Sequence, residues 1–439
     1  MSGALALAYQ TNPDLNQQRA GVRAVDEGVP EATSVFRPQI SASGQYGYSY
    51  LEQLTTPNVP IEGARLRSIL TSSMGVVGVT VSQTLFNGNQ NINGVRRAES
   101  NVLNARESLR LGEETILLSA ATAYMNVLRD AAILDLRKNN VIVLEEQLRQ
   151  TRDRFTVGEV TVTDVAQAQS SLASGRSDYF AAQANLQTSI ANYRQIIGVE
   201  PGRLQPARTI EAILPRSLPV AIDVAMAEHP AIQAALHAVD SAELAVKIQE
   251  GQLYPTLSAV GQATDYYAYL GAPGVKVFNG TILAQASVPI YTGGLVDAQV
   301  RQAKETLSQA RIQADLQRVN ARAQVVSAWG VLEAAKAAIR SQESAVKAAE
   351  VALAGVREEA KVGQRTTFDV LFQQQTLLNA RVALVVAQRD RVVASYNVMA
   401  AIGRLTADNL NLNVVQYDPT IHYDAVKDKW IGFRTPDGR

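Results

Sequence analysis

Two aspartates in a repeated nine-residue stretch are the residues whose type and spacing could best support chemistry. Asp164 lies in VGEVTVTDV at 157–165, and Asp369 lies in VGQRTTFDV at 362–370. The two stretches agree at five of nine positions and begin 205 residues apart. A carboxylate at such a position can cap the start of a helix, or it can act on ions when several copies gather around an axis.

The histidines do not predict a metal site or a catalytic site. His229 and His237 lie eight residues apart near Glu228 and Asp240, which is a poor spacing for shared metal coordination. The alternative for His229 is the start of a helix, with Pro230 as the first helical residue. The sequence has no GxSxG, Walker or HExxH motif. We therefore expect no enzyme, no metal and no cofactor.

The composition excludes several other classes of protein. The chain has 439 residues, with 41 lysines and arginines against 41 aspartates and glutamates, so nothing in its net charge favours nucleic acid as a partner. It has no cysteine, which excludes disulfides and lipid attachment at a cysteine. The run 115–128 has 14 residues, fewer than the roughly 20 of a membrane-spanning helix. The start, MSGALALAYQ, lacks the basic region of a signal peptide.

The repeated stretch belongs to a longer internal repeat. Over their second halves the two copies align at a constant offset in residue number. Between Tyr50 and Met74 this offset changes by 12 residues, so we expect a long loop at 51–72. The aligned segments are 154–198 with 359–403, 82–99 with 287–304, and 37–45 with 254–262. The expected domains are a first repeat at 1–200, a linker at 201–218, a second repeat at 219–403 and a C-terminal tail at 404–439.

Each copy is expected to contain a helix, two strands, a very long helix, a turn and a return helix. No proline occurs at 61–200 or 290–418, and strong helix formers fill both stretches. The predicted long helices are ~90–156 and ~295–361, and the return helices are ~161–198 and ~366–403. Apolar residues recur every seven positions in the return helices, which predicts left-handed coiled coils. These heptads are Val165, Leu172, Tyr179, Leu186 and Tyr193, and Leu371, Leu378, Val385, Val392 and Met399.

Four strands are predicted at ~37–50, ~73–86, ~254–267 and ~281–291. In QISASGQYGYSY (39–50) the even positions are apolar or aromatic and the odd positions are mostly serine and glutamine. Such alternation is typical of outer-membrane barrels, and the alternative is a soluble hairpin packed on a helix. Four strands cannot close a barrel in lipid, so strands that face lipid would require several chains.

The chain resembles the TolC family of trimeric outer-membrane efflux and secretion channels over about residues 4–415. The stretches that carry the resemblance are RFTVGEVTVTDV (154–165), VGQRTTFDV (362–370), PIYTGGLVDAQVRQA (289–303), QTLFNGN (83–89) and AATAYMNVL (120–128).

The resemblance implies a mainly α fold with a small antiparallel β part, assembled as a homotrimer. Its strands would form a 12-stranded transmembrane β-barrel in the outer membrane of a Gram-negative bacterium, and its helices a coiled-coil tunnel in the periplasm. The implied function is the exit duct of a tripartite system for type I protein secretion, multidrug efflux or both. The implied partners are outer-membrane lipid, a periplasmic adaptor protein and, through it, an inner-membrane pump. The alternative is a trimeric coiled-coil stalk or adhesin without a conducting lumen.

The resemblance also implies roles for residues at the two glycine turns. Asp164 matches an aspartate that links to an arginine on a neighbouring hairpin, and Arg365 matches that arginine. Asp369 matches one of a pair of constriction aspartates, and Phe372 stands where the family has the other. Carboxylate rings favour cations. The alternative for Asp164 and Asp369 is that they cap or flank helix starts. The implied docking rim for the adaptor is Val157, Gly158, Glu159, Val362, Gly363 and Gln364.

Overall fold

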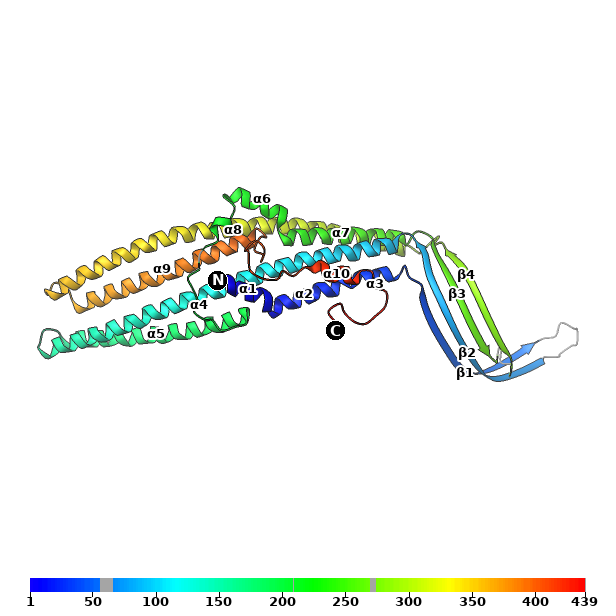
Figure 1. The fold of residues 1–439 in the computed structure, drawn as a ribbon, viewed down its shortest axis with the longest axis horizontal. Coiled ribbons are helices and arrows are strands. Elements are labelled where there is room, and N and C mark those ends of the chain that lie inside the picture. The colour runs from blue at the N-terminus through cyan, green and yellow to red at the C-terminus, as the bar shows by residue number, and fades with distance from the viewer. Residues whose placement is uncertain (56–65, 208, 269–273, 439) are drawn as a thin grey trace. The chain divides into compact units, whose positions relative to one another are not determined.

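The computed structural model of the protein describes residues 1–55, 66–207, 209–268 and 274–438. Within these residues the chain is mainly helical with one small antiparallel sheet, as predicted (Figure 1). It forms two compact units, and each draws on both sequence repeats. Unit 1 comprises residues 1–22, 104–236 and 313–419, and unit 2 comprises residues 23–103, 237–312 and 420–439.

The helices include two of 67 residues each, α4 and α8, which lie within the two proline-free stretches. Each is followed by a tight turn and a return helix. The helices are α1 (Ser2–Thr11), α2 (Pro13–Asp26), α3 (Gly28–Ser34), α4 (Gln90–Thr156), α5 (Val162–Ile197), the 3-10 helix η1 (Glu211–Ile213), α6 (Leu218–Glu228), α7 (Pro230–Gly251), α8 (Leu295–Lys361), α9 (Thr367–Ala401) and α10 (Pro419–Val426). No helix in the described part of the chain is both long and apolar enough to span a membrane.

Unit 2 contains the sheet, in which β1 (Gln39–Thr55), β2 (Leu66–Asn87), β3 (Thr256–Tyr267) and β4 (Lys276–Ser287) pair in sequence order. All three pairings are antiparallel, and β1 and β4 form the two edges. Figure 1 shows the four strands side by side in one curved sheet.

The expected strand bounds were wrong in two places. The loop expected at 51–72 is shorter, because β1 and β2 continue to pair as far as Thr55 and Leu66. An ion pair of 2.7 Å between Arg67 Nε and Glu52 Oε1 supports this extension. The remaining part of that loop, 56–65, lies outside the described residues. The strand expected at ~281–291 covers Lys276–Ser287 instead, because the register with β3 pairs Tyr267 with Lys276.

The apolar face of the sheet is exposed. Tyr46 and Tyr48 of β1 are 84% and 75% exposed, and Ile282 of β4 is 91% exposed. A soluble hairpin would cover such side chains against a helix, because exposed apolar surface is costly in water. The described residues therefore contradict the alternative of a soluble hairpin packed on a helix.

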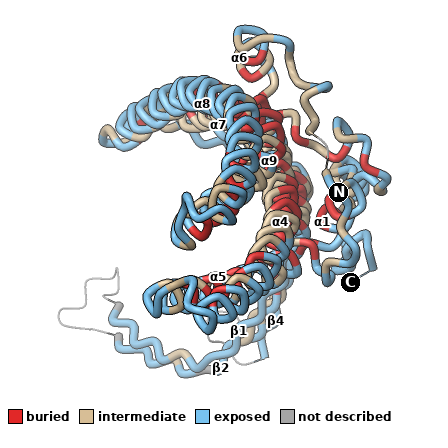
Figure 2. Tube along the Cα trace, turned by 90° about the vertical axis from the view of Figure 1, so that its left-hand side faces the viewer, coloured by how far each residue is buried: buried red, intermediate tan, exposed pale blue. Residues whose placement is uncertain are grey.

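Unit 1 is held by a core in which α1, α4, α5, α6, α8 and α9 meet. Figure 2 shows buried residues along facing sides of α4 and α9 and mostly exposed residues on α8. The heptads of the return helices are buried or half-buried, as coiled-coil packing requires. At Gly175 an added Cβ would lie 2.7 Å from Leu144 Cδ1, so the small side chain lets α5 approach α4 closely.

The first helical segment of each repeat is interrupted at a proline. Asn12 and His229 have the same extended backbone (φ −62, ψ 124), and Pro13 and Pro230 are the first residues of α2 and α7. Proline is favoured at a first helical position, since its missing N–H would have no partner there. The expected helix start at Pro230 is therefore present, and His229 follows α6 and accepts from the Ala231 N–H through Nδ1 at 3.2 Å.

The linker expected at 201–218 forms ion pairs with α8 and α9. In η1, Glu211 accepts from Arg391 Nε of α9 at 2.8 Å and lies 3.5 Å from Lys336 Nζ of α8. The hydrogen bond from Arg391 is the main cause of the lowered pKa of Glu211. The division of the chain into repeats, linker and tail remains a prediction about the sequence.

Candidate functional site at the hairpin tips

The two turns of unit 1 have the same backbone. At the first tip the Gly158 N–H donates to Phe155 O at 3.0 Å and the Glu159 N–H to Arg154 O at 2.9 Å. At the second tip Gly363 donates to Ala360 O at 3.3 Å and Gln364 to Glu359 O at 3.0 Å. This is the Schellman pattern, and the glycines have φ of 78° and 77°, where a side chain would be strained. The glycines are thus required to reverse the chain.

A capping box starts the return helix at each tip. The Thr161 N–H and hydroxyl donate to Asp164 Oδ2 at 2.9 and 2.7 Å, and the Asp164 N–H donates to Thr161 Oγ1 at 3.3 Å. Thr366 and Asp369 repeat this arrangement at 2.9, 2.8 and 3.2 Å. Both aspartates therefore cap helices, which was the alternative for them, and capping does not exclude a second role in an assembly.

These hydrogen bonds control the ionisation of both carboxyl groups. The hydroxyl of Thr161 is the largest cause of the lowered pKa of Asp164, followed by its backbone N–H. The backbone N–H of Thr366 is the largest cause for Asp369, whose pKa is also lowered. Both groups therefore stay ionised at neutral pH and present a negative charge at the start of each return helix, where the helix dipole favours it.

The tips carry opposite charges at one equivalent position, and Glu159 and Arg365 align with the uncharged Gln364 and Val160. Arg154 of the first tip aligns with Glu359 of the second. Arg154 Nε lies 2.9 Å from Glu159 Oε2, and Glu359 Oε2 lies 2.8 Å from Arg365 Nε. Each tip thus closes its turn with an ion pair of its own, and the two pairs have opposite polarity.

The structure does not join the two residues expected to link neighbouring hairpins. In the part of the chain that it describes, Arg365 donates to Glu359, and Asp164 accepts from Thr161. The expected link runs between hairpins of an assembly, so the gating roles of Asp164 and Arg365 remain a prediction.

The first turn of α9 separates a packed face from a free face. Leu371 packs with Leu144, Leu148, Ala168 and Leu172 of the first hairpin. Gln374, one turn later, donates from Nε2 to Asn140 Oδ1 at 3.3 Å. These contacts fix the rotation of α9 about its axis.

On the free face of α9, Phe372 is 62% exposed and its ring stacks on that of Phe368, with centroids 6.3 Å apart. Asp369 lies three residues before Phe372, which is close to one helical turn. The sequence analysis did not single out Phe368, although its spacing of four residues from Phe372 is the signal of an adjacent pair on a helix.

The residues of the expected docking rim are exposed. Val157 and Val362 are 70% and 71% exposed, and Gly158, Glu159, Gly363 and Gln364 are exposed as well. Figure 1 shows both hairpins of unit 1 ending on the same side. The rim is thus accessible to a partner, although its role in docking remains a prediction.

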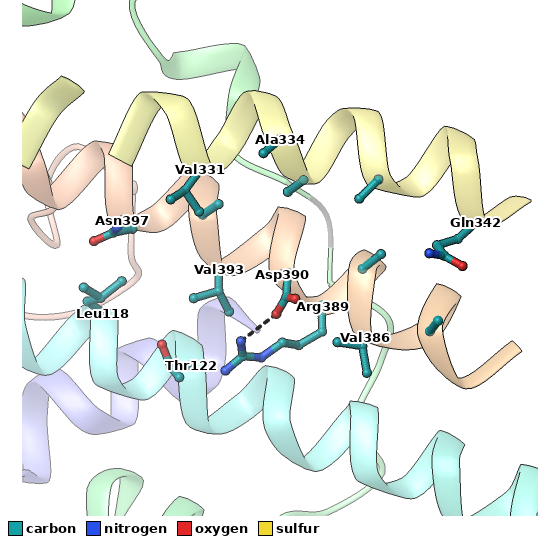
Figure 3. Close-up of a pocket in the computed structure, with 15 residues that line it drawn as sticks. Leu118, Thr122, Val331, Ala334, Gln342, Val386, Arg389, Asp390, Val393 and Asn397 are labelled. Atoms are coloured by element: carbon teal, nitrogen blue, oxygen red, sulfur yellow. Dashed lines mark hydrogen bonds and ion pairs between the residues drawn. The ribbon is translucent and has the colours of Figure 1, made fainter. Parts of the chain in front are cut away.

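One groove of unit 1 is lined mostly by apolar side chains. It has a volume of 640 Å³ and lies between α4, α8 and α9. Figure 3 shows Arg389 paired with Asp390 beside Thr122 and Val393. Arg389 Nη1 donates to Asp390 Oδ1 at 2.8 Å, and its Nε and Nη2 donate to Asn126 Oδ1 at 3.0 and 2.7 Å.

One buried carboxyl group stands out in unit 1. Glu114 is 2% exposed, and neither of its Oε atoms has a hydrogen-bond partner. Burial raises its pKa to about 9. Among the described residues, no group of three or more His, Asp or Glu side chains could hold a metal ion. Glu114 is therefore a neutral acid in a helical core.

Comparison with known proteins assigns the fold and the family. The sequence pattern of the family described as "Outer membrane efflux protein" matches residues 4–199 and 221–404. The chain is 43% identical to the outer membrane efflux protein BepC of Brucella suis over all of this chain and 93% of that protein. It is 26% identical to the outer membrane protein TolC of Escherichia coli over 92% of this chain and 82% of TolC.

Solved structures show the same fold at low identity. The Campylobacter jejuni CmeC outer membrane channel superposes with a TM-score of 0.79 at 17% identity, over 97% of this chain and 89% of CmeC. VceC of Vibrio cholerae superposes with a TM-score of 0.75 at 20% identity, over 91% of this chain and 95% of VceC. The predicted fold class and the resemblance to the TolC family are confirmed.

Proposed function

This chain belongs to the outer membrane efflux protein family, and from that premise we propose that three copies form the exit duct of a tripartite export system. The protein is located in the outer membrane, as are BepC and TolC by name. The family consists of channels and gives no indication of enzymatic activity.

The exposed apolar face of the sheet, together with its two edges, is the observation that carries the proposal. Edges β1 and β4 present unpaired N–H and C=O groups. Such groups are not tolerated in lipid, so the strands of other copies must pair with them. Three copies of four strands give twelve, an even number within the range of membrane barrels. The tyrosine face would then contact lipid and the serine and glutamine face would line water.

The helical hairpins of three copies would form a tunnel whose periplasmic end is a ring of six tips. Asp164 and Arg365 would hold this end closed, and Asp369 and Phe372 would line its narrowest point. The exposed rim at Val157, Gly158, Glu159, Val362, Gly363 and Gln364 would receive a periplasmic adaptor protein, which connects to an inner-membrane pump. The support is the resemblance of the tips and their exposure.

The main candidate for cargo is small molecules. BepC, which is similar over the whole chain, is an efflux protein by name. Protein secretion is the second candidate, because half of the chain is 23% identical to the alkaline protease secretion protein AprF of Pseudomonas aeruginosa. Deleting the protein and measuring both antibiotic tolerance and secreted protein would separate the two. Loss of tolerance with normal secretion is expected.

The duct is tested by ion conductance of the purified protein in a planar lipid bilayer. We expect discrete channel openings from a species whose mass in detergent is that of three chains. A stalk or adhesin would insert or bind without conductance, and a monomeric mass would contradict the proposal as well.

A further inference from the structure

We propose that the C-terminal turn KWIGFR, residues 429–434, is a membrane-surface anchor that binds the phospholipids of the outer membrane next to the sheet. The proposal rests on the location of the protein in the outer membrane. It does not depend on the gate, the adaptor or the cargo.

The turn has a defined shape that displays its apolar side chains. The Lys429 N–H donates to Val426 O at 2.9 Å, and Lys429 Nζ donates to the Arg434 carbonyl oxygen, which closes the turn. Gly432 has φ of 126°, a conformation that favours glycine and lets the chain reverse. The residues inside the closed turn point outward: Trp430 is 68%, Ile431 89% and Phe433 106% exposed.

The turn is fixed to unit 2 by the helix before it. Val426 at the end of α10 is completely buried. His422 Nδ1 lies 3.0 Å from Oδ2 of Asp26, which is itself fully buried in α2. A helix held in this way gives the turn a fixed position, so the exposure of Trp430, Ile431 and Phe433 belongs to the fold.

Arg37 places the turn at one end of the sheet. Arg37 Nη1 donates to Lys429 O at 2.8 Å, and the guanidinium carbon lies 4.5 Å from the ring centroid of Trp430. Arg37 stands two residues before the start of β1 at Gln39. Figure 1 shows the segment after α10 beside α3, the helix that leads into β1. The turn therefore lies at the end of the sheet where β1 begins.

That end of the sheet already carries exposed apolar and aromatic side chains. Because the strands are antiparallel, the start of β1, the end of β2, the start of β3 and the end of β4 lie together. Exposed apolar residues at these ends are Phe36, Ile40, Leu85, Phe86, Tyr254, Leu257, Ile290 and Tyr291. The turn thus continues an apolar band that belongs to a membrane-embedded sheet.

The composition of the turn fits the boundary between lipid headgroups and acyl chains. Tryptophan is enriched at that depth because its ring is apolar and its N–H is polar. Lys429, Arg434 and Arg37 place positive charge around the turn. Lys429 Nζ is held by the Arg434 carbonyl oxygen and Arg37 lies over Trp430, so the exposed Arg434 is the long side chain that can extend toward a headgroup phosphate. The positive charge around the turn favours an anionic lipid surface as the occupant.

The two tryptophans of the chain allow a direct test. Trp329→Phe leaves Trp430 as the only tryptophan, and Trp430→Phe leaves Trp329, which is half-buried against the core of unit 1. Each full-length variant is reconstituted in phosphatidylcholine and phosphatidylglycerol vesicles with acyl chains brominated either near the headgroup or near the bilayer centre. We expect Trp430 emission to fall by about half or more with the shallow bromines, less with the deep ones, and Trp329 emission to stay unchanged.

Two further results decide the matter. With Ile431→Ser and Phe433→Ser added, Trp430 should lose most of its quenching and become accessible to iodide. If iodide quenches Trp430 and the brominated lipids do not, Trp430 is exposed to water. If neither reagent quenches it, Trp430 is covered by protein. Either result overturns the anchor. Conductance of the same variants is measured in parallel, so that failure of the anchor alone is distinguished from failure of the duct.

Discussion

Arg365 Nε lies 2.8 Å from Glu359 Oε2 within its own hairpin tip. The arginine proposed to close the entrance therefore has a partner in its own turn, and the hydrogen bond that it donates to Glu359 is the largest cause of its raised pKa. A link from Arg365 to Asp164 of a neighbouring hairpin would have to compete with Glu359. In the proposed gate, Glu359 would therefore oppose the closed state.

Removal of Arg365 and removal of its partner Glu359 should change the single-channel conductance in opposite directions. Arg365→Ala removes the link and should raise the single-channel conductance, whereas Glu359→Ala frees Arg365 for Asp164 and should lower it. A single exposed ion pair contributes little, so the effect on the equilibrium depends on its repetition in three copies. Asp164→Ala should reproduce Arg365→Ala. If both tip variants change conductance in the same direction, Arg365 only stabilises its own turn.

The constriction should respond to charge at two positions of α9. Asp369→Ala removes the carboxylate ring and should reduce the selectivity for potassium over chloride, because such a ring favours cations. Phe372→Asp adds a second ring and should increase that selectivity and the block by divalent cations. Reversal potentials in a salt gradient measure both effects. Phe368→Asp, one turn earlier, is the control, and an equal effect there would show that the charge acts outside the narrowest point.

The first return helix should fray in acid. The lowered pKa of Asp164 means that its cap is at full strength above the ordinary carboxyl pKa near 4 and is lost as the pH falls through the lower folded-state value. Thr161→Ala removes the cap at any pH, at a cost of about 1 kcal/mol. Hydrogen exchange of the amides of 162–166 should then rise about fivefold at neutral pH. Unchanged exchange in the variant would show that contacts between helices hold this turn.

Replacement of the buried acid should make the helical unit less sensitive to pH. The raised pKa of Glu114, about 9, means that the folded chain keeps a proton that the unfolded chain releases above pH 4.5. Stability is therefore lost as the pH rises from 4.5 toward 9, by about 3 kcal/mol at pH 7. Glu114→Gln should unfold at a higher temperature than the native protein at pH 8 and not at pH 5, measured by circular dichroism. The exposed Glu99→Gln is the control, and equal shifts at both pH values would contradict the role of burial.

The helical part of the fold was predictable because its signals are local. Long proline-free runs with strong helix formers give α4 and α8, and a glycine at Gly158 and Gly363 stops each of them. The threonine and aspartate three residues apart in both repeats also signal a capping box. Such features depend on neighbours in the sequence and so can be recognised from the sequence alone.

The strands and the ion pairs of the tips were less predictable because they depend on partners elsewhere. KVFNG at the start of β4 has asparagine and glycine, which are poor strand formers, and only pairing with β3 extends the strand there. The pairs Arg154 with Glu159 and Glu359 with Arg365 require the turn to fold first. Whether Asp164 meets Arg365 depends on other copies of the chain, which no single-chain pattern describes.

The opposite polarity of Arg154 and Glu359 has a consequence for symmetry. The two tips of one chain share a backbone but not a charge pattern, so six of them around an axis alternate in kind. An adaptor that meets this ring would find three identical doublets rather than six equivalent sites. Six adaptor copies would therefore bind at two inequivalent kinds of site. An adaptor that binds only one kind would bind with three copies per ring.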